Sequence, residues 1–367
     1  MQLTSNYVHT SMVYIMTNME AMNTVIAFNR DMNGMLTFVG SYPTYGKGTG
    51  AKEVSTATPN DGIDPLMSEG SLTLSPDGRF LFAVNTGSNS ISSFIVSDRG
   101  KLILVDVKPS GGTQPNSIGV FGNLLYVSNV GDPANQFTSN ISGFRIEDSG
   151  HLTHIPGSIH SLSTINAQPV QILFTRDGSK MVVPELTTNH LSVFHVNKNG
   201  TLNGPIINES NGMTPFGSSI LSSGVLLVSE AGSNALSSYS LSDNGIINVI
   251  SGSIPTGQKA TCWVTTSRNE QFAYAINTLS GTITIYRIDR NGALTVVGHT
   301  TSTPAGTATG LPMNVGVSKD GRNLYTLNGN QGTVSVFNIN DDGSLVRIQV
   351  AKWTEFPYFG SQGLAIL

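Results

Sequence analysis

The chain has few charged residues and a single cysteine. Only 11% of its 367 residues are Asp, Glu, Lys or Arg, whereas about a quarter is usual in soluble domains. The lone Cys262 excludes an internal disulfide. The formal net charge is -4 and no basic run occurs, so nucleic acid and anionic membranes are not expected partners. No apolar run approaches the roughly 20 residues of a membrane helix.

The first ten residues are polar and uncharged, without the basic and apolar regions of a signal peptide. This start favours the cytoplasm. A surface rich in Ser, Thr and Asn, with sequons at Asn140 and Asn208, would instead suit a secreted protein whose leader has been removed. The compartment therefore stays open. We expect a monomer.

Glycine, in contrast, is abundant, with 40 residues. Seven of these glycines lie in recurring turns of the type Asn-Gly-x-Leu, at positions 34, 100, 150, 200, 245, 292 and 343. The spacing is 45 to 51 residues except for one step of 66, and it matches the blade length of a β-propeller. Asn-Gly between alternating apolar segments predicts a hairpin with a type I′ turn.

Each turn follows a strand of alternating pattern, such as Ile91–Val96 or Leu191–Val196. An earlier strand in each unit ends in Asn or Glu, as in Phe80–Asn85 and Met181–Glu185. A further hairpin, such as Ser75–Gly78, precedes several of them. These patterns predict one all-β domain over residues 1–367, a seven-bladed β-propeller with four-stranded antiparallel blades.

The two ends of the chain complement each other. The first unit lacks its innermost strand, and Gly363–Leu367 has the pattern of such a strand with no blade after it. We expect the C-terminal strand to complete the first blade, which closes the ring and hides the sheet edges. The 66-residue step predicts an insertion over about residues 41–69, and loops of this length are usually functional or disordered.

Val13–Asn18, followed by Asn23-Thr24-Val25, is similar to a Tyr-Val-Thr-Asn type of propeller repeat. The whole chain resembles the lactonase-type seven-bladed propellers, a family that includes 6-phosphogluconolactonase-like and carboxy-cis,cis-muconate-cyclase-like proteins. Segments such as Thr214–Gly217 and Thr261–Val264 resemble a poorly characterised subgroup of that family. The resemblance implies a propeller fold and chemistry on a small lactone or a related cyclic metabolite.

The site motifs of that family are altered in this chain. Where better-known members carry a His-Pro-His-type motif entering the fourth blade, the chain reads Ala167–Gln171, without histidine. Where they carry a Pro-Asp-Leu-Gly-like motif followed by a basic residue, it reads Pro184-Glu185-Leu186-Thr187, with His190 at the basic position. A mechanism that needs the missing imidazoles does not transfer to this chain.

Two carboxylates break the internal repeat. The second strands of the units end at equivalent positions that ring one face, and they are Asn except for Glu185 and Glu230 on adjacent blades. Departures from a repeat's own consensus are where function is expected. The two acids could divide the roles of acid and base, with His190 beside them. Alternatively, they could be solvated rim residues or pair with Lys259 or His190.

Loops on the same face supply further candidates. Amides there could orient a carbonyl group, and aromatic rings could stack on a ligand, although both could equally serve the backbone and the core. Cys262 could act as a nucleophile with His190 but could also be a small buried hydrophobe. The candidate substrate-binding residues are Gln114, Asn116, Gln168, Gln171, Phe216, Lys259, Cys262, Trp263, Asn314 and Gln362.

The sequence contains no close metal-ligand spacing and no nucleotide-binding fingerprint, so we expect neither a metal nor another cofactor. The favoured hypothesis is a metal-independent enzyme that hydrolyses or forms a small lactone, or cyclises or isomerises a related metabolite, at the channel mouth. The alternative is a non-catalytic propeller that binds a ligand or a protein through the same face. A small molecule is the expected partner.

Overall fold

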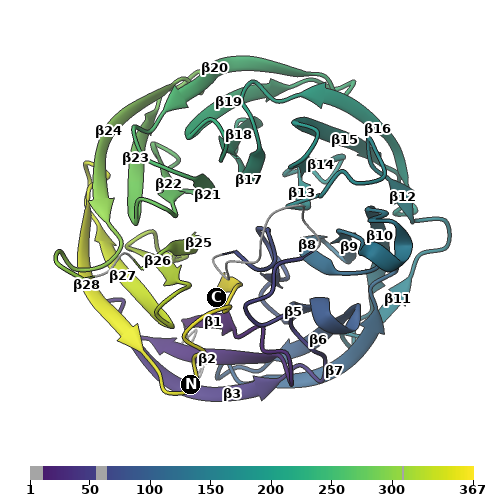
Figure 1. The fold of residues 1–367 in the computed structure, drawn as a ribbon, viewed down its shortest axis with the longest axis horizontal. Coiled ribbons are helices and arrows are strands. Elements are labelled where there is room, and N and C mark those ends of the chain that lie inside the picture. Colours follow the sequence, from purple (N-terminus) through teal and green to yellow (C-terminus); the bar gives the residue numbers. More distant parts are fainter. Residues whose placement is uncertain (1–10, 55–63, 308–309) are drawn as a thin grey trace, which may run out of the picture.

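The alternating segments of the sequence form strands that assemble into seven sheets around a central axis (Figure 1). The computed structural model describes residues 11–54, 64–307 and 310–367. Each sheet is a blade whose strands run antiparallel, and in every blade except the third the longest strand lies at the rim (Figure 1). The prediction of an all-β, seven-bladed propeller is therefore confirmed.

Each blade begins near the axis and ends at the rim. In this order, blade 1 comprises β29 (Leu364–Ile366), β1 (Met12–Met16), β2 (Thr24–Arg30) and β3 (Leu36–Pro43). Blade 2 comprises β4 (Leu72–Leu74), β5 (Phe80–Asn85), β6 (Ser90–Val96) and β7 (Leu102–Pro109). Blade 3 comprises β8 (Pro115–Phe121), β9 (Leu124–Asn129), β10 (Asn140–Ile146) and β11 (Leu152–His154), with β12 (His160–Ser161) also paired to β10.

The remaining blades follow the same order. Blade 4 comprises β13 (Leu173–Phe174), β14 (Lys180–Glu185), β15 (His190–Val196) and β16 (Leu202–Glu209). Blade 5 comprises β17 (Pro215–Ile220), β18 (Val225–Glu230), β19 (Ala235–Leu241) and β20 (Ile247–Pro255). Blade 6 comprises β21 (Thr261–Thr266), β22 (Phe272–Asn277), β23 (Thr282–Ile288) and β24 (Leu294–Thr301). Blade 7 comprises β25 (Pro312–Val317), β26 (Asn323–Asn328), β27 (Thr333–Ile339) and β28 (Leu345–Lys352).

Blade 3 differs from the four-strand pattern because its outer strand is split. β11 pairs with the end of β10, and β12 pairs with its start. Pro156 and Gly157 lie between the two pieces, and proline cannot donate to a ladder. The two short strands therefore occupy the place of one outer strand.

The turn type was predicted incorrectly. A type I′ turn needs a positive φ at both central residues. Gly34 has φ +90°, but Asn33 before it is not left-handed, and the Asp31 carbonyl accepts a hydrogen bond from the Gly34 N–H at 3.0 Å. This geometry fits a type I turn followed by a left-handed glycine, which is the three-residue hairpin loop.

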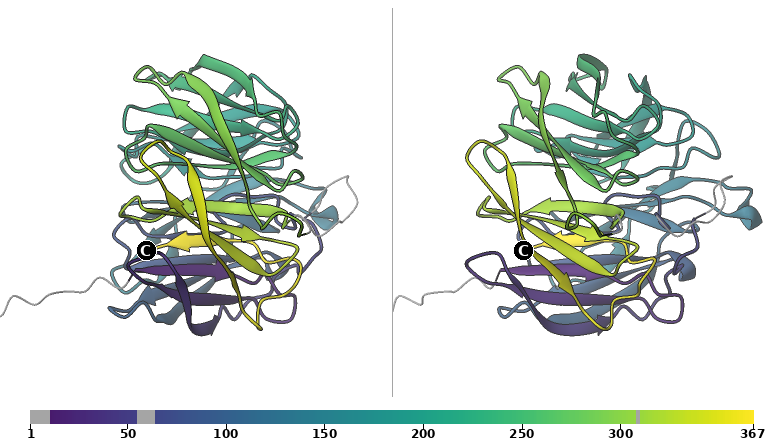
Figure 2. Two further views of the ribbon diagram at one scale, coloured as in Figure 1. Left: turned by 90° about the vertical axis from the view of Figure 1, so that its left-hand side faces the viewer. Right: turned by 60° about the vertical axis from the view of Figure 1, so that its left-hand side comes forward.

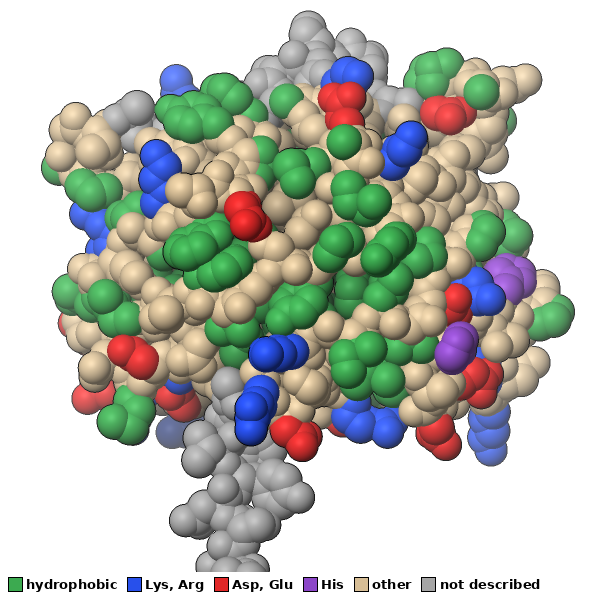
Figure 3. Space-filling model, turned by 90° about the horizontal axis from the view of Figure 1, so that it is seen from below, with side chains coloured by type: hydrophobic (Ala, Val, Ile, Leu, Met, Phe, Trp, Pro, Cys, Tyr) green, Lys and Arg blue, Asp and Glu red, His purple; other side chains and the backbone are tan. Residues whose placement is uncertain are grey.

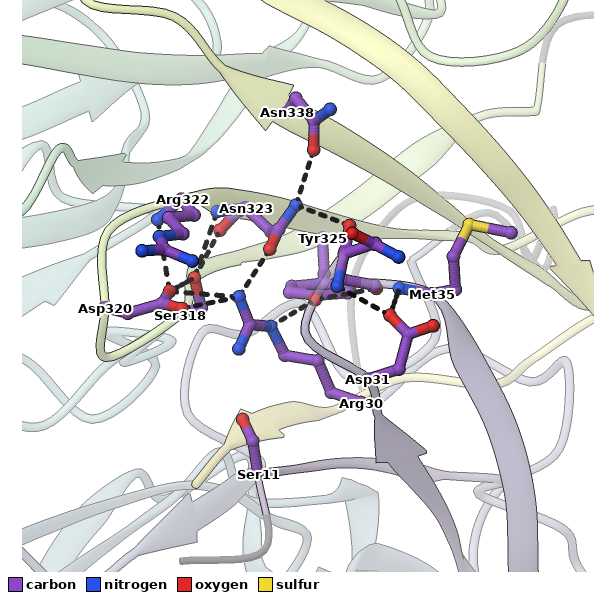
Figure 4. Close-up of polar contacts among 12 residues, drawn as sticks. Ser11, Arg30, Asp31, Met35, Ser318, Asp320, Arg322, Asn323, Tyr325 and Asn338 are labelled. Carbon is purple, nitrogen blue, oxygen red and sulfur yellow. Dashed lines mark hydrogen bonds and ion pairs between the residues drawn. The ribbon is translucent and has the colours of Figure 1, made fainter.

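The C-terminal strand closes the ring as predicted. β29 pairs with β1, with Ala365 opposite Tyr14, and Figure 2 shows the yellow C-terminal strand beside the purple first strand. Arg30, at the end of β2, also joins blade 1 to blade 7. Its guanidinium donates to the Tyr325 hydroxyl at 2.9 Å and to the Asp320 carboxylate at 2.8 Å (Figure 4). This buried Arg30 cluster, which includes Asn323, ties the first and last blades together.

Neighbouring blades are also linked by a repeated tyrosine. Tyr126 of β9 donates to the carbonyl of Gly200 in the hairpin of the next blade at 2.9 Å. Tyr14 makes the same bond to Gly100 at 2.8 Å. Apolar side chains fill the space between blades. At the outer edge, Figure 3 shows hydrophobic groups scattered among uncharged polar ones, with few charges. No helix in the described part of the chain is long and apolar enough to cross a membrane.

Candidate functional site

The segment between β3 and β4 covers the mouth of the central channel. This is the predicted insertion, of which residues 55–63 lie outside the described residues. Residues 64–69, which we call the plug, are bound by side chains from separate blades. The Trp263 indole donates to the Ser68 carbonyl at 2.9 Å, and the Gln362 amide oxygen accepts the Leu66 N–H at 2.8 Å. The plug therefore occupies the place where we expected substrate.

Several predicted substrate-binding amides serve the protein itself. Asn116 donates to the Pro169 carbonyl at 2.7 Å and to the plug's Leu66 carbonyl at 3.4 Å. Gln171 bonds both the N–H and the carbonyl of Ser218 on the next inner strand, at 2.7 and 3.1 Å. Asn314 accepts the Gly363 N–H at 2.8 Å. These buried amides join neighbouring inner strands or hold the plug.

Two other predicted residues belong to a repeated turn. Gln114 and Gln168 have left-handed backbones, with φ of 55° and 50°, just before the inner strands of blades 3 and 4. Thr214 and Ala260 have the same conformation at the equivalent positions, with φ of 59° and 56°. The turn thus follows from the repeat. Lys259 is exposed, and its N–H donates to the Ser280 hydroxyl at 2.8 Å.

The two out-of-pattern carboxylates are enclosed in their own blades. Glu185 and Glu230 are both 0% exposed. Glu230 accepts hydrogen bonds from the Gly212 N–H at 2.9 Å and the Ser253 hydroxyl at 2.6 Å, besides those from Ser237 and Tyr239. Glu185 accepts from Ser163, Thr188 and Ser192. Neither acid lines a described pocket, contrary to the expectation that both open on the channel mouth.

The equivalent asparagines explain this arrangement. Asn85 donates to the hydroxyl of Ser92, seven residues further on the next strand, at 2.7 Å. Asn277 and Asn328 make the same contact with Thr284 and Ser335. A hydroxyl can donate as well as accept, so a carboxylate at this position receives the proton that an amide would supply. Glu in place of Asn therefore preserves the link between the two strands.

The proposed partners of these acids are placed differently. His190 pairs with Glu185 across the strand ladder, and its Nδ1 lies 4.0 Å from the carboxylate. Cys262 lies elsewhere, 8% exposed near the start of β21. Burial raises the pKa of its thiol far above the ordinary value, and the charge of Asp64 acts in the same direction. A thiol held neutral is a poor nucleophile.

A pocket beside the plug is the better candidate site. Its volume is about 190 Å³, and three predicted residues, Phe216, Cys262 and Trp263, line it. The Phe216 and Trp263 rings meet edge to face with centroids 5.2 Å apart. The other lining residues come from the insertion and from the loops of blades 4 to 6: Glu53, Asp64, Met67, Leu186, Thr214, Ala231, Ala260, Thr278 and Leu279.

The reactive groups of this pocket are carboxylates from the insertion. Burial raises the pKa of Asp64 to about 8, while the hydrogen bond from Gln362 lowers it and the nearby Glu53 charge raises it. The Gln362 amide donates to Asp64 Oδ1 at 2.6 Å and thereby orients the carboxyl group. A carboxyl with a pKa near neutrality can act as a general base or acid.

Sequence reasoning did not identify Glu53 or Asp64. The long insertion was itself a signal of function, but no local pattern ties either acid to Trp263 or Gln362, which lie 199 and 298 residues after Asp64. Only the closed ring brings them together.

A second cavity opens below the plug. It has a volume of about 810 Å³, is lined by the inner strands β4, β8, β13 and β29, and reaches the hairpins at Pro76 and Arg176. Glu69, at the end of the plug, forms part of its wall, and burial raises the pKa of this carboxyl well above its ordinary value. Among the described residues, no group of three or more His, Cys, Asp or Glu could hold a metal ion.

Comparison with known proteins agrees with this fold. The chain is 24% identical over 326 residues to a 6-phosphogluconolactonase of Formosa agariphila, covering 85% of this chain and 81% of the relative. A 6-phosphogluconolactonase of Serratia proteamaculans is 25% identical over 286 residues, covering 74% of this chain and 80% of the relative.

Among solved structures, the periplasmic gluconolactonase of Pseudomonas aeruginosa superposes with a TM-score of 0.75 over 97% of this chain and 99% of that one, at 16% identity. This likeness concerns the fold. The sequence profile described as "Lactonase, 7-bladed beta-propeller" matches residues 6–160 and 226–356. The match spans well over half of the chain, which therefore belongs to the lactonase family of seven-bladed β-propellers.

Proposed function

We propose that this protein hydrolyses small lactones in the pocket beside the plug, with Asp64 as the general base. The observation that carries the proposal is the buried Asp64 carboxyl in the wall of an aromatic pocket, with its pKa raised to about 8. Family membership and relatives named 6-phosphogluconolactonase and gluconolactonase support lactone hydrolysis as the reaction.

The reaction balances with water as the sole co-reactant. The Asp64 carboxylate removes a proton from water as the water oxygen attacks the lactone carbonyl carbon. The Thr214 hydroxyl, which lines the pocket, can donate to the carbonyl oxygen as it gains negative charge. The ring C–O bond then breaks, and the proton held by Asp64 passes to the leaving ring oxygen. The product is a hydroxy acid.

The pocket residues have distinct tasks in this scheme. Gln362 is a positioning residue, since it bonds Asp64 and also donates to the Ser68 carbonyl at 3.0 Å. Trp263 and Phe216 pack at the pocket wall and exclude water from the carboxyl group. Glu53 raises the pKa of Asp64 through its charge.

The test is the pH dependence of lactone hydrolysis by wild type and Asp64→Asn. Because the base must be unprotonated, we expect the wild-type kcat to rise with pH through a midpoint near 8, after subtraction of spontaneous hydrolysis. Loss of a general base should lower kcat by about 10²- to 10⁴-fold. Glu20→Gln is the matched control, because Glu20 is exposed and pairs with Lys52 at 3.2 Å. Full activity of a folded Asp64→Asn protein would refute the assignment.

A further inference from the structure

The pocket beside the plug differs from a phosphate site in its charges. None of its lining residues is Lys, Arg or His, and the two that ionise besides Cys262 are the carboxyls Glu53 and Asp64. Phosphate recognition relies on cationic side chains or on clustered N–H donors. A phosphorylated lactone would meet negative charge in this pocket without a compensating cation.

The cations closest along the chain to the lining residues do not supply one. Lys52 precedes Glu53 but pairs with Glu20 at 3.2 Å, on the exposed surface. Lys259 precedes Ala260 but is exposed and is not part of the pocket wall. Both lie outside the lining that a bound ring would contact.

The shape and polarity of the pocket also point away from a sugar. Its wall is mostly apolar, with Trp263 and Phe216 at the back and Leu186, Met67 and Leu279 beside them. A polyhydroxylated ring would lose hydrogen bonds to water that this wall does not replace. The volume is about 190 Å³, and an apolar cavity of about 150 Å³ is large enough for a benzene ring.

We infer that the substrates are small, uncharged lactones with an apolar ring substituent, and that phosphorylated sugar lactones are rejected. This inference rests on the proposed function and narrows it to a substrate class. The apolar substituent packs against the indole and phenyl rings, and the ester carbonyl faces the carboxyl groups of the insertion. Selectivity then arises from unpaired negative charge on one side and from unsatisfied hydroxyls on the other.

The first experiment compares three lactones at one pH: a δ-alkyl δ-valerolactone, glucono-δ-lactone and 6-phosphoglucono-δ-lactone. We expect kcat/KM to be at least tenfold higher for the alkyl lactone than for the sugar lactone, and lowest for the phosphorylated one. A higher kcat/KM for the phosphorylated lactone would overturn the substrate class while leaving lactone hydrolysis intact.

A charge-reversal variant tests the cause. Leu279 lines the pocket and is 53% exposed, so Leu279→Arg adds a cation at the pocket rim without burying it. We expect the ratio of kcat/KM for the phosphorylated lactone to that for the alkyl lactone to rise about tenfold. Ile246→Arg is the matched control, because Ile246 is 42% exposed in a hairpin away from the pocket. An equal change in both variants would contradict the inference.

Binding is measured separately so that the two proposals can fail separately. The probes are a δ-alkyl valerolactam, which is not hydrolysed, and 6-phosphogluconate, both titrated by calorimetry. If the lactam binds and 6-phosphogluconate does not, the selectivity holds even for a protein without turnover, and only the hydrolase proposal fails. Tighter binding of 6-phosphogluconate, or no binding of the lactam, would overturn the inference.

Discussion

Replacement of Glu230 by alanine tests whether this buried acid holds the fold. Glu230 is 0% exposed and accepts hydrogen bonds from one backbone N–H, that of Gly212, and from the hydroxyls of Ser237, Tyr239 and Ser253. These donors belong to the loop before β17 and to β19 and β20. The acid therefore joins parts of blade 5 that the backbone ladder alone does not connect.

The cost of Glu230→Ala follows from the donors that lose their acceptor. A buried N–H without an acceptor, as at Gly212, costs about 1–3 kcal/mol, and each of the three hydroxyl bonds contributes roughly 0.5–1.5 kcal/mol. We therefore expect a loss of about 4 kcal/mol in the free energy of unfolding. With an unfolding entropy of about 0.8 kcal/mol per kelvin for 367 residues, Tm falls by about 5 °C.

Glu230→Gln should be much milder, with a loss of about 1 kcal/mol, because the amide oxygen can keep the Gly212 contact and the NH₂ group can donate to the Ser253 hydroxyl. The assay is thermal and urea denaturation, together with lactone turnover per folded molecule. Glu209→Ala is the control, since Glu209 is exposed at the end of β16. Loss of turnover in Glu230→Gln at unchanged Tm would refute the structural role and restore the catalytic hypothesis.

Three further outcomes are expected. Tyr126→Phe leaves the buried Gly200 carbonyl without its donor and should lower the free energy of unfolding by about 1–2 kcal/mol; an unchanged urea midpoint would contradict the link between blades. Burial would raise the pKa of Asp320, but hydrogen bonds and the charge of Arg30 outweigh it and lower the pKa below 3.8, so its stabilisation is present above about pH 4 and lost as pH falls below that. Asp320→Asn should therefore destabilise the protein at pH 7 and lose less stability than wild type on acidification, and equal acid slopes in denaturation would argue against this coupling. Cys262 should react with a thiol reagent only after unfolding, because burial raises the pKa of its thiol; rapid labelling of the native protein would show otherwise.

The sequence alone determined the architecture. Glycine turns at a spacing near 50 residues and period-two strands are local signals, and each blade repeats them, so an error in one unit is corrected by the others. The strand ends at Asn85, Glu185 and Asn328 agree with the structure. The closing strand was also predictable, because a missing strand at one end matched a surplus one at the other.

The site was decided by tertiary contacts. Glu185 and Glu230 departed from the repeat, but their hydroxyl neighbours, and thus their structural role, come from loops and strands that sequence position does not rank. Asp64 acquires its raised pKa only because the closed ring brings Gln362 and the apolar pocket wall around it. Burial is a property of the assembled molecule, and the titration of a carboxyl group depends on burial more than on its neighbours along the chain.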